Sequence, residues 1–129
     1  MANQFVVQLK NEPGAMANLA EALANAGVDL RAIGGGSMGD SGHVIMTTAD
    51  DDTTKRVLDD GGYTYIEGES ILAEVDDRPG GMARLSRALA DAGVNIYGHL
   101  FLGRWGDRAM FAFVVDKPEI AKPILERKG

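Results

Sequence analysis

The chain of 129 residues is 45% hydrophobic and 25% charged, which is typical of a globular protein with one ordinary domain or two very small ones. It contains no cysteine, which excludes disulfides, Fe–S clusters, thiolate zinc sites and cysteine nucleophiles. Its net charge of -6 disfavours a nucleic-acid partner. No apolar run approaches the roughly 20 residues of a membrane span, and the N-terminus does not have the basic segment of a signal peptide. We therefore expect a cytoplasmic protein with no membrane association.

The sequence contains an internal repeat. Residues 13–30 (PGAMANLAEALANAGVDL) align with residues 79–96 (PGGMARLSRALADAGVNI), and 11 of the 18 aligned positions are identical. Such a match indicates a duplicated unit of about 65 residues, a size that is marginal for independent stability. We predict two domains, one in residues 1–67 and one in residues 69–129.

In the first repeat, apolar residues alternate at strand spacing near the N-terminus and then recur at helical spacing. The elements that we expect are a strand over residues 5–9, a helix that ends near Gly27, strands over 28–38 and 43–48, a helix over 50–60 and a strand over 63–67. This order, βαββαβ, predicts an antiparallel sheet with both helices on one face, which is the ferredoxin-like plan.

The second repeat follows the same pattern with strands expected over residues 94–104 and 109–115. After a final helical segment in residues 117–128 the chain has no room for a fourth strand. The predicted fold class is therefore α+β, with two ferredoxin-like βαββαβ units in tandem, the second of which lacks its last strand.

Two motifs have an ordinary structural interpretation. Residues 34–39 fit the dinucleotide pattern G-x-G-x-x-G, but they precede a predicted strand instead of a helix, so we interpret them as a flexible hairpin end. The run Asp50–Asp52 is typical of a helix N-terminus, and we prefer this interpretation to a metal site. With two histidines and no arrangement of nucleophile, base and orienting acid, the sequence predicts no metal, no cofactor and no catalysis.

The second repeat has one strand face that is rich in aromatic residues. If the alternate residues of the same strands face the helices, this face carries Tyr97, His99, Phe101, Phe111, Phe113 and Val115. Because a solvated sheet face is normally polar, we expect this face to be covered by another sheet or another subunit.

The strand-to-helix turns are the candidate ligand sites, because helix N-termini present unpaired N–H groups and attract carboxylates. Each repeat places an amide and an acid near its turn, in opposite order: Asn11 and Asp29 in the first, Asp77 and Asn95 in the second. An acid can hold an ammonium group, and an amide together with backbone N–H groups can hold a carboxylate, so the pair fits an α-amino acid. The alternative is turn chemistry alone, since Asn and Asp favour turns for local reasons.

The βαββαβ pattern, the turn that ends in Pro-Gly, the alanine-rich helix and the closing A-G-V-[N/D]-[I/L] together resemble the ACT domain. This small regulatory module binds amino acids in many biosynthetic enzymes and regulators. The resemblance extends over nearly the whole chain, once in each repeat, and the second repeat is the closer match. ACT domains typically associate through their sheets with effectors at the interface, so the resemblance implies a homodimer.

The resemblance also implies which residues bind the ligand. In ACT-regulated serine-pathway dehydrogenases, an amide in the turn and another at the start of the second strand hold the effector. The family's histidine four residues before the proline is absent here, and Leu9 and Val75 stand in its place, which argues against serine. The expected site consists first of Asp77, Arg78, Gly80, Gly81 and Asn95, and then of Asn11, Gly14 and Asp29.

Within this site we expect the N–H groups of Gly80 and Gly81 to face the ligand carboxylate, Asp77 to take the ammonium group and Asn95 to complete the grip. The function implied is that of a non-catalytic regulatory protein that binds an amino acid or related small metabolite at strand–helix turns and domain interfaces. An alternative is an interaction module that docks on a metabolic enzyme without a ligand of its own. An enzyme on a ferredoxin-like fold is the third and least favoured class.

Overall fold

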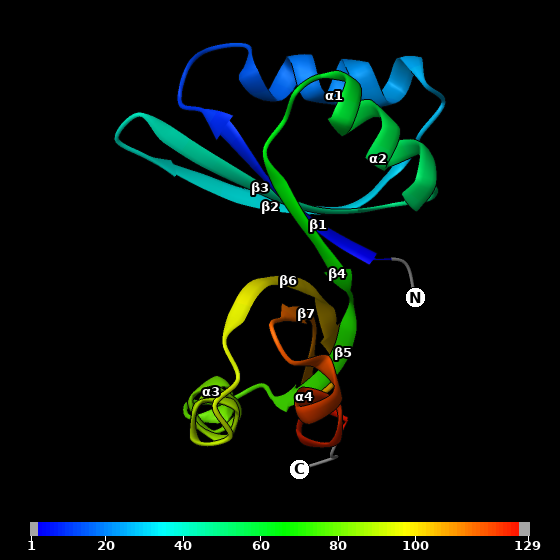
Figure 1. Cartoon of the computed structure of the whole chain (residues 1–129). Coiled ribbons are helices and arrows are strands. Elements are labelled where there is room, and N and C mark those ends of the chain that lie inside the picture. The colour runs from blue at the N-terminus through cyan, green and yellow to red at the C-terminus, as the bar shows by residue number, and fades with distance from the viewer. Residues whose placement is uncertain (1–2, 127–129) are drawn as a thin grey trace. The chain divides into compact units, whose positions relative to one another are not determined.

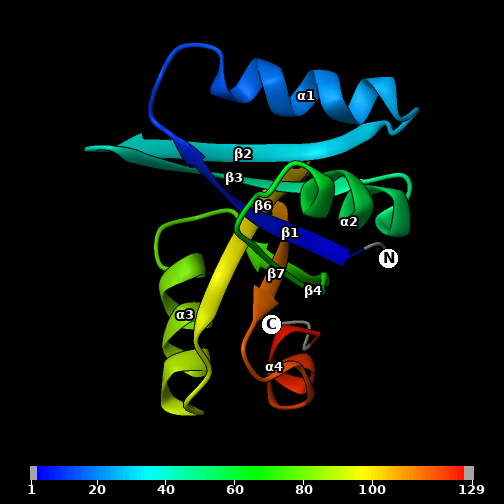
Figure 2. The ribbon, with the colours of Figure 1, turned by 45° about the horizontal axis from the view of Figure 1, so that its top comes forward.

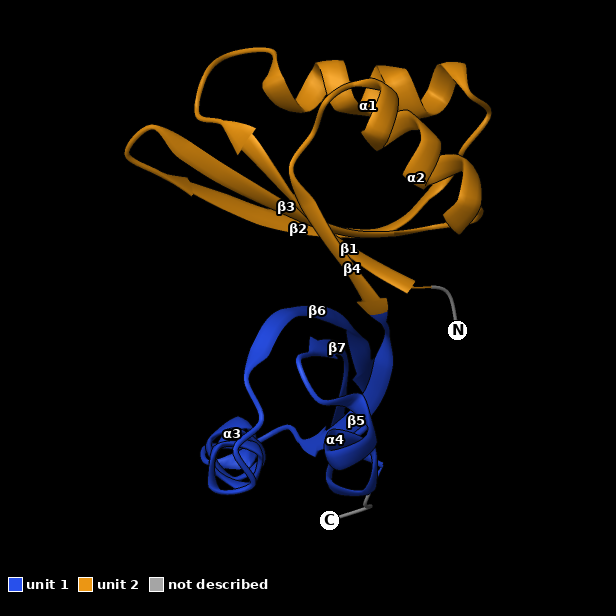
Figure 3. Ribbon diagram, in the orientation of Figure 1, with its two compact units in different colours: residues 1, 69–129 blue, residues 2–68 orange. Residues whose placement is uncertain are grey.

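The computed structural model describes residues 3–126, which form two compact units with a boundary between Gly68 and Glu69 (Figure 3). The elements follow one another in the order βαββαβ in the first unit and βαββα in the second (Figure 1). The duplication that is visible in the sequence thus appears as two copies of one plan.

The first unit contains β1 (Asn3–Lys10), α1 (Ala15–Asn25), β2 (Leu30–Met38), β3 (Ser41–Thr48), α2 (Asp51–Asp60) and β4 (Tyr65–Glu69). Its sheet has the strand order β2-β3-β1-β4, and both β1 and β2 are antiparallel to β3. Strands β2 and β3 run side by side as a long hairpin (Figure 2). Both helices cover one face of the sheet (Figure 1), where the fully buried side chains include Phe5, Val7, Leu19, Leu23, Met46 and Leu58.

Glycine in the left-handed region ends the first helix of each unit. Gly27 has a φ of 77°, and the N–H of the next residue, Val28, donates to the Leu23 carbonyl at 2.9 Å. Gly93 has a φ of 75° in the second unit and ends α3 in the same way. These two hydrogen-bonded ends satisfy carbonyl groups that the helix leaves unpaired, which explains why the A-G-V sequence recurs.

The acidic run before α2 is a helix N-terminus, as predicted. Asp50 is the N-cap, and its carboxylate accepts hydrogen bonds from the Thr53 N–H at 3.0 Å and from the Thr53 hydroxyl at 2.6 Å. Asp51 and Asp52 then occupy the first turn, where the partial positive charge of the helix end favours carboxylates.

The second unit contains β5 (Ile71–Asp76), α3 (Gly81–Asp91), β6 (Ile96–Trp105), β7 (Arg108–Val115) and α4 (Pro118–Leu125). Its sheet has three strands in the order β5-β7-β6, which corresponds to β1-β3-β2 of the first unit. Within residues 69–126 no strand occupies the position beside β5 that β4 occupies beside β1. The prediction that the second repeat lacks its last strand is confirmed for the described part of the chain.

The β7 part of the aromatic face of this second sheet packs on the helices of its own unit. Phe113 is only 1% exposed and lies in a core cluster with Leu89 of α3 and Leu125 of α4, and Phe111 packs against the same cluster. Phe113 pairs in register with Ile71, which belongs to that core as well. For the β7 residues of this face, the expectation that another sheet or subunit covers them was therefore wrong, whereas Tyr97, His99 and Phe101 on β6 are exposed. Because both faces of β7 are apolar, the alternation of residues did not show which face meets the helices.

Candidate functional site

The two strand-to-helix turns, residues 11–14 and 77–80, have the same backbone geometry. Gly14 and Gly80 are the N-cap residues of α1 and α3, with φ angles of 89° and 91°. L side chains rarely adopt this left-handed conformation, so the glycine of each Pro-Gly pair is required by the turn itself. The geometry of the turn thus accounts for the Pro-Gly pair that both repeats share.

Each turn is tied to the hairpin of its own unit by one backbone hydrogen bond. The Asn11 N–H donates to the Asp40 carbonyl at 3.1 Å, and the Asp77 N–H donates to the Asp107 carbonyl at 2.8 Å. The side chains of the turn thus meet those of the β2–β3 or β6–β7 hairpin at one end of the sheet. The repeat motif alone does not reveal this neighbour, because the hairpin residues are distant in sequence.

Four arginine side chains converge on the turn of the second unit. Asp77 accepts a hydrogen bond from Nε of Arg104 at 2.7 Å, so the acid predicted to hold an ammonium group already has a guanidinium partner. The neighbouring carboxylate of Asp76 contacts three further guanidinium groups, those of Arg78 at 3.1 Å, Arg84 at 3.4 Å and Arg108. Sequence reasoning found Arg78 but missed the others, which reach the turn from α3 and from the hairpin.

Gly81 has a packing role in this turn. Its N–H donates to the Arg78 carbonyl at 3.1 Å. A Cβ atom at this position would lie 2.2 Å from the carbonyl oxygen of Asp76, so the helix start approaches the strand too closely for any side chain. The expectation that the Gly81 N–H faces a ligand was wrong, because this N–H already has a backbone partner. A contact from the Gly80 N–H stays a prediction.

Asn95 lies at the opposite end of the sheet from the turn. Its N–H donates to the Asp116 carboxylate at 2.9 Å, just past the end of β7, whereas Asp77 is bonded to Asp107 just before β7 begins. The eight residues of β7 span about 23 Å. One unit therefore does not bring Asp77 and Asn95 together, and the expected grip within a single repeat was wrong. The reason is that α3 returns the chain to the far end of the sheet before β6 starts.

The first unit shows the same separation with different partners. The Asn11 carboxamide nitrogen donates to the Gly39 carbonyl at 2.9 Å, which fixes this side chain against the hairpin. At the far end, the exposed Asp29 carboxylate forms an ion pair with Arg31 at 3.4 Å. Within residues 3–126 the Asn11 side chain has no charged partner, in contrast to Asp77 at the matching position.

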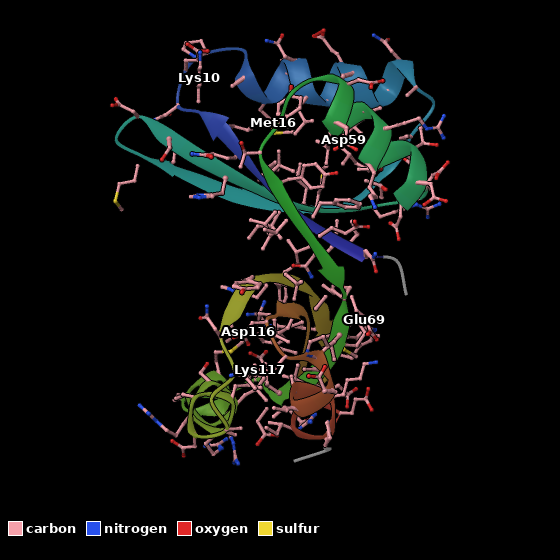
Figure 4. The ribbon with its side chains drawn as sticks, viewed as in Figure 1. Lys10, Met16, Asp59, Glu69, Asp116 and Lys117 are labelled. Carbon is pink, nitrogen blue, oxygen red and sulfur yellow. The ribbon has the colours of Figure 1, made fainter. Side chains whose placement is uncertain are left out.

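A cleft opens beside each turn, between the helix and the hairpin. The cleft of the first unit measures about 300 Å³, and its walls include Lys10, Asn11, Glu12, Met16, Ile33 and His43. Figure 4 shows Lys10 at the end of β1 and Met16 on the side of α1 that faces the sheet. The cleft of the second unit measures about 400 Å³, and its walls include Asp77, Arg78, Met82, Arg104 and Phe111. Both volumes are at the lower end of the range for small-molecule sites.

Two further sequence hypotheses concern metals and nucleotides. Between residues 3 and 126, no cluster of three or more histidine or acidic side chains could hold a metal ion. Residues 34–39 lie in β2 and in its turn to β3, so their interpretation as the end of a hairpin is confirmed. None of the helices in the described part of the chain is long and apolar enough to cross a membrane.

Comparison with known proteins identifies the architecture. No protein-family model matches the chain, and no curated protein matches it. Among solved structures, protein BT0572 from Bacteroides thetaiotaomicron matches with a TM-score of 0.72 and 20% identity, over 97% of this chain and 86% of its own. The ligand-free regulatory subunit of aspartate kinase from Thermus thermophilus matches with a TM-score of 0.60 and 20% identity, over 97% of this chain and 89% of its own. The regulatory subunit of aspartate kinase from Thermus flavus matches with a TM-score of 0.61 and 17% identity, over 98% of this chain and 92% of its own.

The chain has the tandem ACT fold. The matches extend over both ACT units and confirm the fold class predicted from the sequence, two ferredoxin-like units in tandem. At these levels of identity they establish the fold and leave the ligand contacts of the ACT turns as predictions.

Proposed function

We propose that this tandem ACT protein is a non-catalytic regulatory protein that binds an α-amino acid or a related small metabolite at its strand–helix turns. The observation that carries the proposal is the cleft beside each turn, bordered by the start of a helix, by acidic side chains and, in the first unit, by an amide side chain. A likeness in fold to regulatory subunits of aspartate kinase supports the regulatory role.

In this proposal a turn carboxylate holds the ligand ammonium group, a cation and backbone N–H groups hold its carboxylate, and an amide adds a further polar contact. The proposed contacts are Asp77, Arg78 and Gly80 in the second unit, and Asn11 and Gly14 in the first. Asp29 and Asn95 lie at the far ends of their own sheets, so a turn of another ACT unit would have to meet them, and we propose that a second copy of the chain supplies that unit. A homodimer is for this reason part of the proposal.

The regulatory effect follows from linkage. A ligand that binds the associated form more tightly than the separate form shifts the population toward association, by no more than its difference in affinity for the two forms. The associated form would then differ in its affinity for a partner, such as a metabolic enzyme.

A thermal-shift screen of the whole chain against the twenty common L-amino acids tests the proposal. At 100 times its dissociation constant, a ligand stabilises a one-site protein by about 2.7 kcal/mol. For a unit of this size that stabilisation corresponds to a rise in melting temperature on the order of 10 °C. The variant that carries both Asn11→Ala and Asp77→Ala should lose this rise. If no amino acid stabilises the parent protein, the proposal is refuted.

A second candidate function rests on the exposed aromatic residues of β6. Tyr97, Phe101 and Trp105 are 47%, 49% and 61% exposed, and aromatic side chains of this kind are enriched in protein interfaces. An interaction module without a ligand would show no response to any amino acid. It would bind its enzyme through β6, and Trp105→Ser would weaken that binding.

A further inference from the structure

The two clefts differ in how their own charges are paired. In the second unit, Asp77 is paired with Arg104 at 2.7 Å and Asp76 with Arg78 at 3.1 Å. A ligand ammonium group at Asp77 would have to displace a guanidinium group that is tethered beside it. The network therefore already provides both carboxylates of this turn with guanidinium partners.

The first unit has the opposite arrangement. Residues 10–12, Lys-Asn-Glu, align with residues 76–78, Asp-Asp-Arg, so the matching turn carries one cation, one amide and one anion. Both Lys10 and Glu12 are exposed and border the cleft, and neither forms an ion pair within residues 3–126. Asn11 donates its amide to Gly39, which leaves its carbonyl oxygen as an acceptor. One ammonium and one carboxylate group, as an α-amino acid carries them, complement these side chains.

The interior of the same cleft is apolar and has a wall of bare backbone. Met16 and Ile33, which border it, are 37% and 49% exposed although both are large hydrophobic residues. The β2 wall includes Gly34–Gly36, and a Cβ atom on Gly35 would lie 2.2 Å from the carbonyl oxygen of His43. Only glycine fits there, so that part of the wall offers a flat surface without side chains.

The second unit has an aromatic side chain at the same level of its sheet. Gly35 pairs in register with Val44, and the matching pair in the second unit is Phe101 with Phe111, whose ring centroids are 5.5 Å apart. The Arg104 guanidinium also lies 4.8 Å from the centre of the Phe101 ring. In the second unit, the rings of Phe101 and Phe111 therefore occupy the sheet position at which the first unit has Gly35 and no side chain on β2.

We infer that the first unit contains the amino-acid site and that its ligand is an α-amino acid with an aliphatic or aromatic side chain. This inference rests on the proposed function and narrows it. Glu12 and the Asn11 carbonyl oxygen hold the ammonium group, Lys10 holds the carboxylate, and the side chain lies between Met16 and Ile33 on the glycine wall. The cleft volume of about 300 Å³ suits a ligand of one amino acid.

Isothermal titration calorimetry on the full chain tests the side-chain class. L-Phenylalanine and L-leucine should bind at least tenfold more tightly than L-serine and L-aspartate. 3-Phenylpropanoate, which lacks the ammonium group, and phenethylamine, which lacks the carboxylate, should each bind at least tenfold more weakly than L-phenylalanine. Tighter binding of L-serine or L-aspartate would overturn the assignment of the ligand class.

Substitutions at the rim test the location. Glu12→Gln should weaken the binding of L-phenylalanine about 10- to 100-fold, the usual effect of losing one charge-assisted hydrogen bond. Glu21→Gln removes an exposed carboxylate from the same helix region outside the cleft and serves as the matched control, with less than a twofold change. Melting temperatures of the unliganded variants check that both fold.

The pattern of losses separates this inference from the proposed function. Loss of binding with Asp77→Ala, but not with Glu12→Gln, would place the ligand in the second unit and overturn the inference, while the proposed function would stand. If none of the twenty amino acids binds the parent protein, the proposed function fails and the inference fails with it.

Discussion

Phe113 should be among the residues on which the second unit depends most. Its ring is 1% exposed and packs between α3 and α4 against Leu89 and Leu125. Phe→Ala substitutions in well-packed cores cost about 3–5 kcal/mol, because buried apolar surface is lost and a cavity remains. A unit of about 60 residues has a total stability of about 3–9 kcal/mol. Phe113→Ala should therefore remove most of the stability of the second unit.

Hydrogen exchange followed by mass spectrometry resolves this effect by region. In Phe113→Ala, peptides from β7 and α3 should lose most of their protection, while peptides from β1 and α1, whose core contains Phe5 and Leu19, should change much less. Phe101→Ala is the matched control, because that ring is 49% exposed and its loss should cost less than about 1 kcal/mol.

One outcome would refute the reasoning about the aromatic face. If Phe113→Ala keeps full protection in β7 while its mass in solution falls to that of a smaller oligomer, the ring lies between chains and not in the core of its own unit.

Three further predictions concern local interactions. Asp50→Ala should lower the melting temperature of the first unit at pH 7. The hydroxyl and the N–H of Thr53 donate hydrogen bonds to the Asp50 carboxylate and hold its pKa below the usual value of 3.8. The contribution of this cap to stability is therefore full above about pH 4 and is lost as the pH falls through the folded-state pKa. Calorimetry should show the melting temperatures of variant and parent converging in acid. The hydrogen bond to Asp59 raises the pKa of Tyr65 to about 12, and Asp59→Asn should lower it toward 10 in a spectrophotometric titration of a variant without other tyrosines. Gly14→Ala should cost about 1–2 kcal/mol in urea denaturation because of its φ of 89°, whereas Gly36→Ala, whose Cβ would meet no atom within 4 Å, should cost little.

Much of the fold was predictable because the duplication repeats its own signals. The element order could be predicted from features that occur twice: a Pro-Gly turn, an alanine-rich helix and a glycine that ends this helix. The short segment after β7 predicted a second sheet of three strands. The side of β7 that meets the helices was not predictable. Apolar residues occupy both faces of this strand, and irregular register between Ile96 and Gly98 and between Phe101 and Gly103 changes which residues of β6 share a face.

The candidate site was predictable only as far as local sequence reaches. The turn residues lie at the turns as expected, and the glycines adopt the conformation that the Pro-Gly sequence suggests. The pairing of Asp77 with Arg104 depends on how the hairpin folds back, and the distance between Asp77 and Asn95 depends on the length of β7. The spacing of residues in the motif predicts neither this pairing nor this distance. The same holds for the open charges of Lys10 and Glu12, whose significance emerges from comparison with the second unit.

The contrast between the two turns also makes the repeats unequal in their response to ionic strength. The turn of the second unit is surrounded by exposed guanidinium–carboxylate pairs, and dissolved ions screen such pairs over a distance of about 8 Å at physiological ionic strength. In the first unit the Asn11 side chain at the matching turn is anchored by an amide–carbonyl hydrogen bond, which carries no net charge. Added salt therefore weakens the ion pairs at the turn of the second unit and has almost no effect on the hydrogen bond of Asn11 in the first. The two repeats share one backbone plan, but their turns differ in how their stability responds to salt.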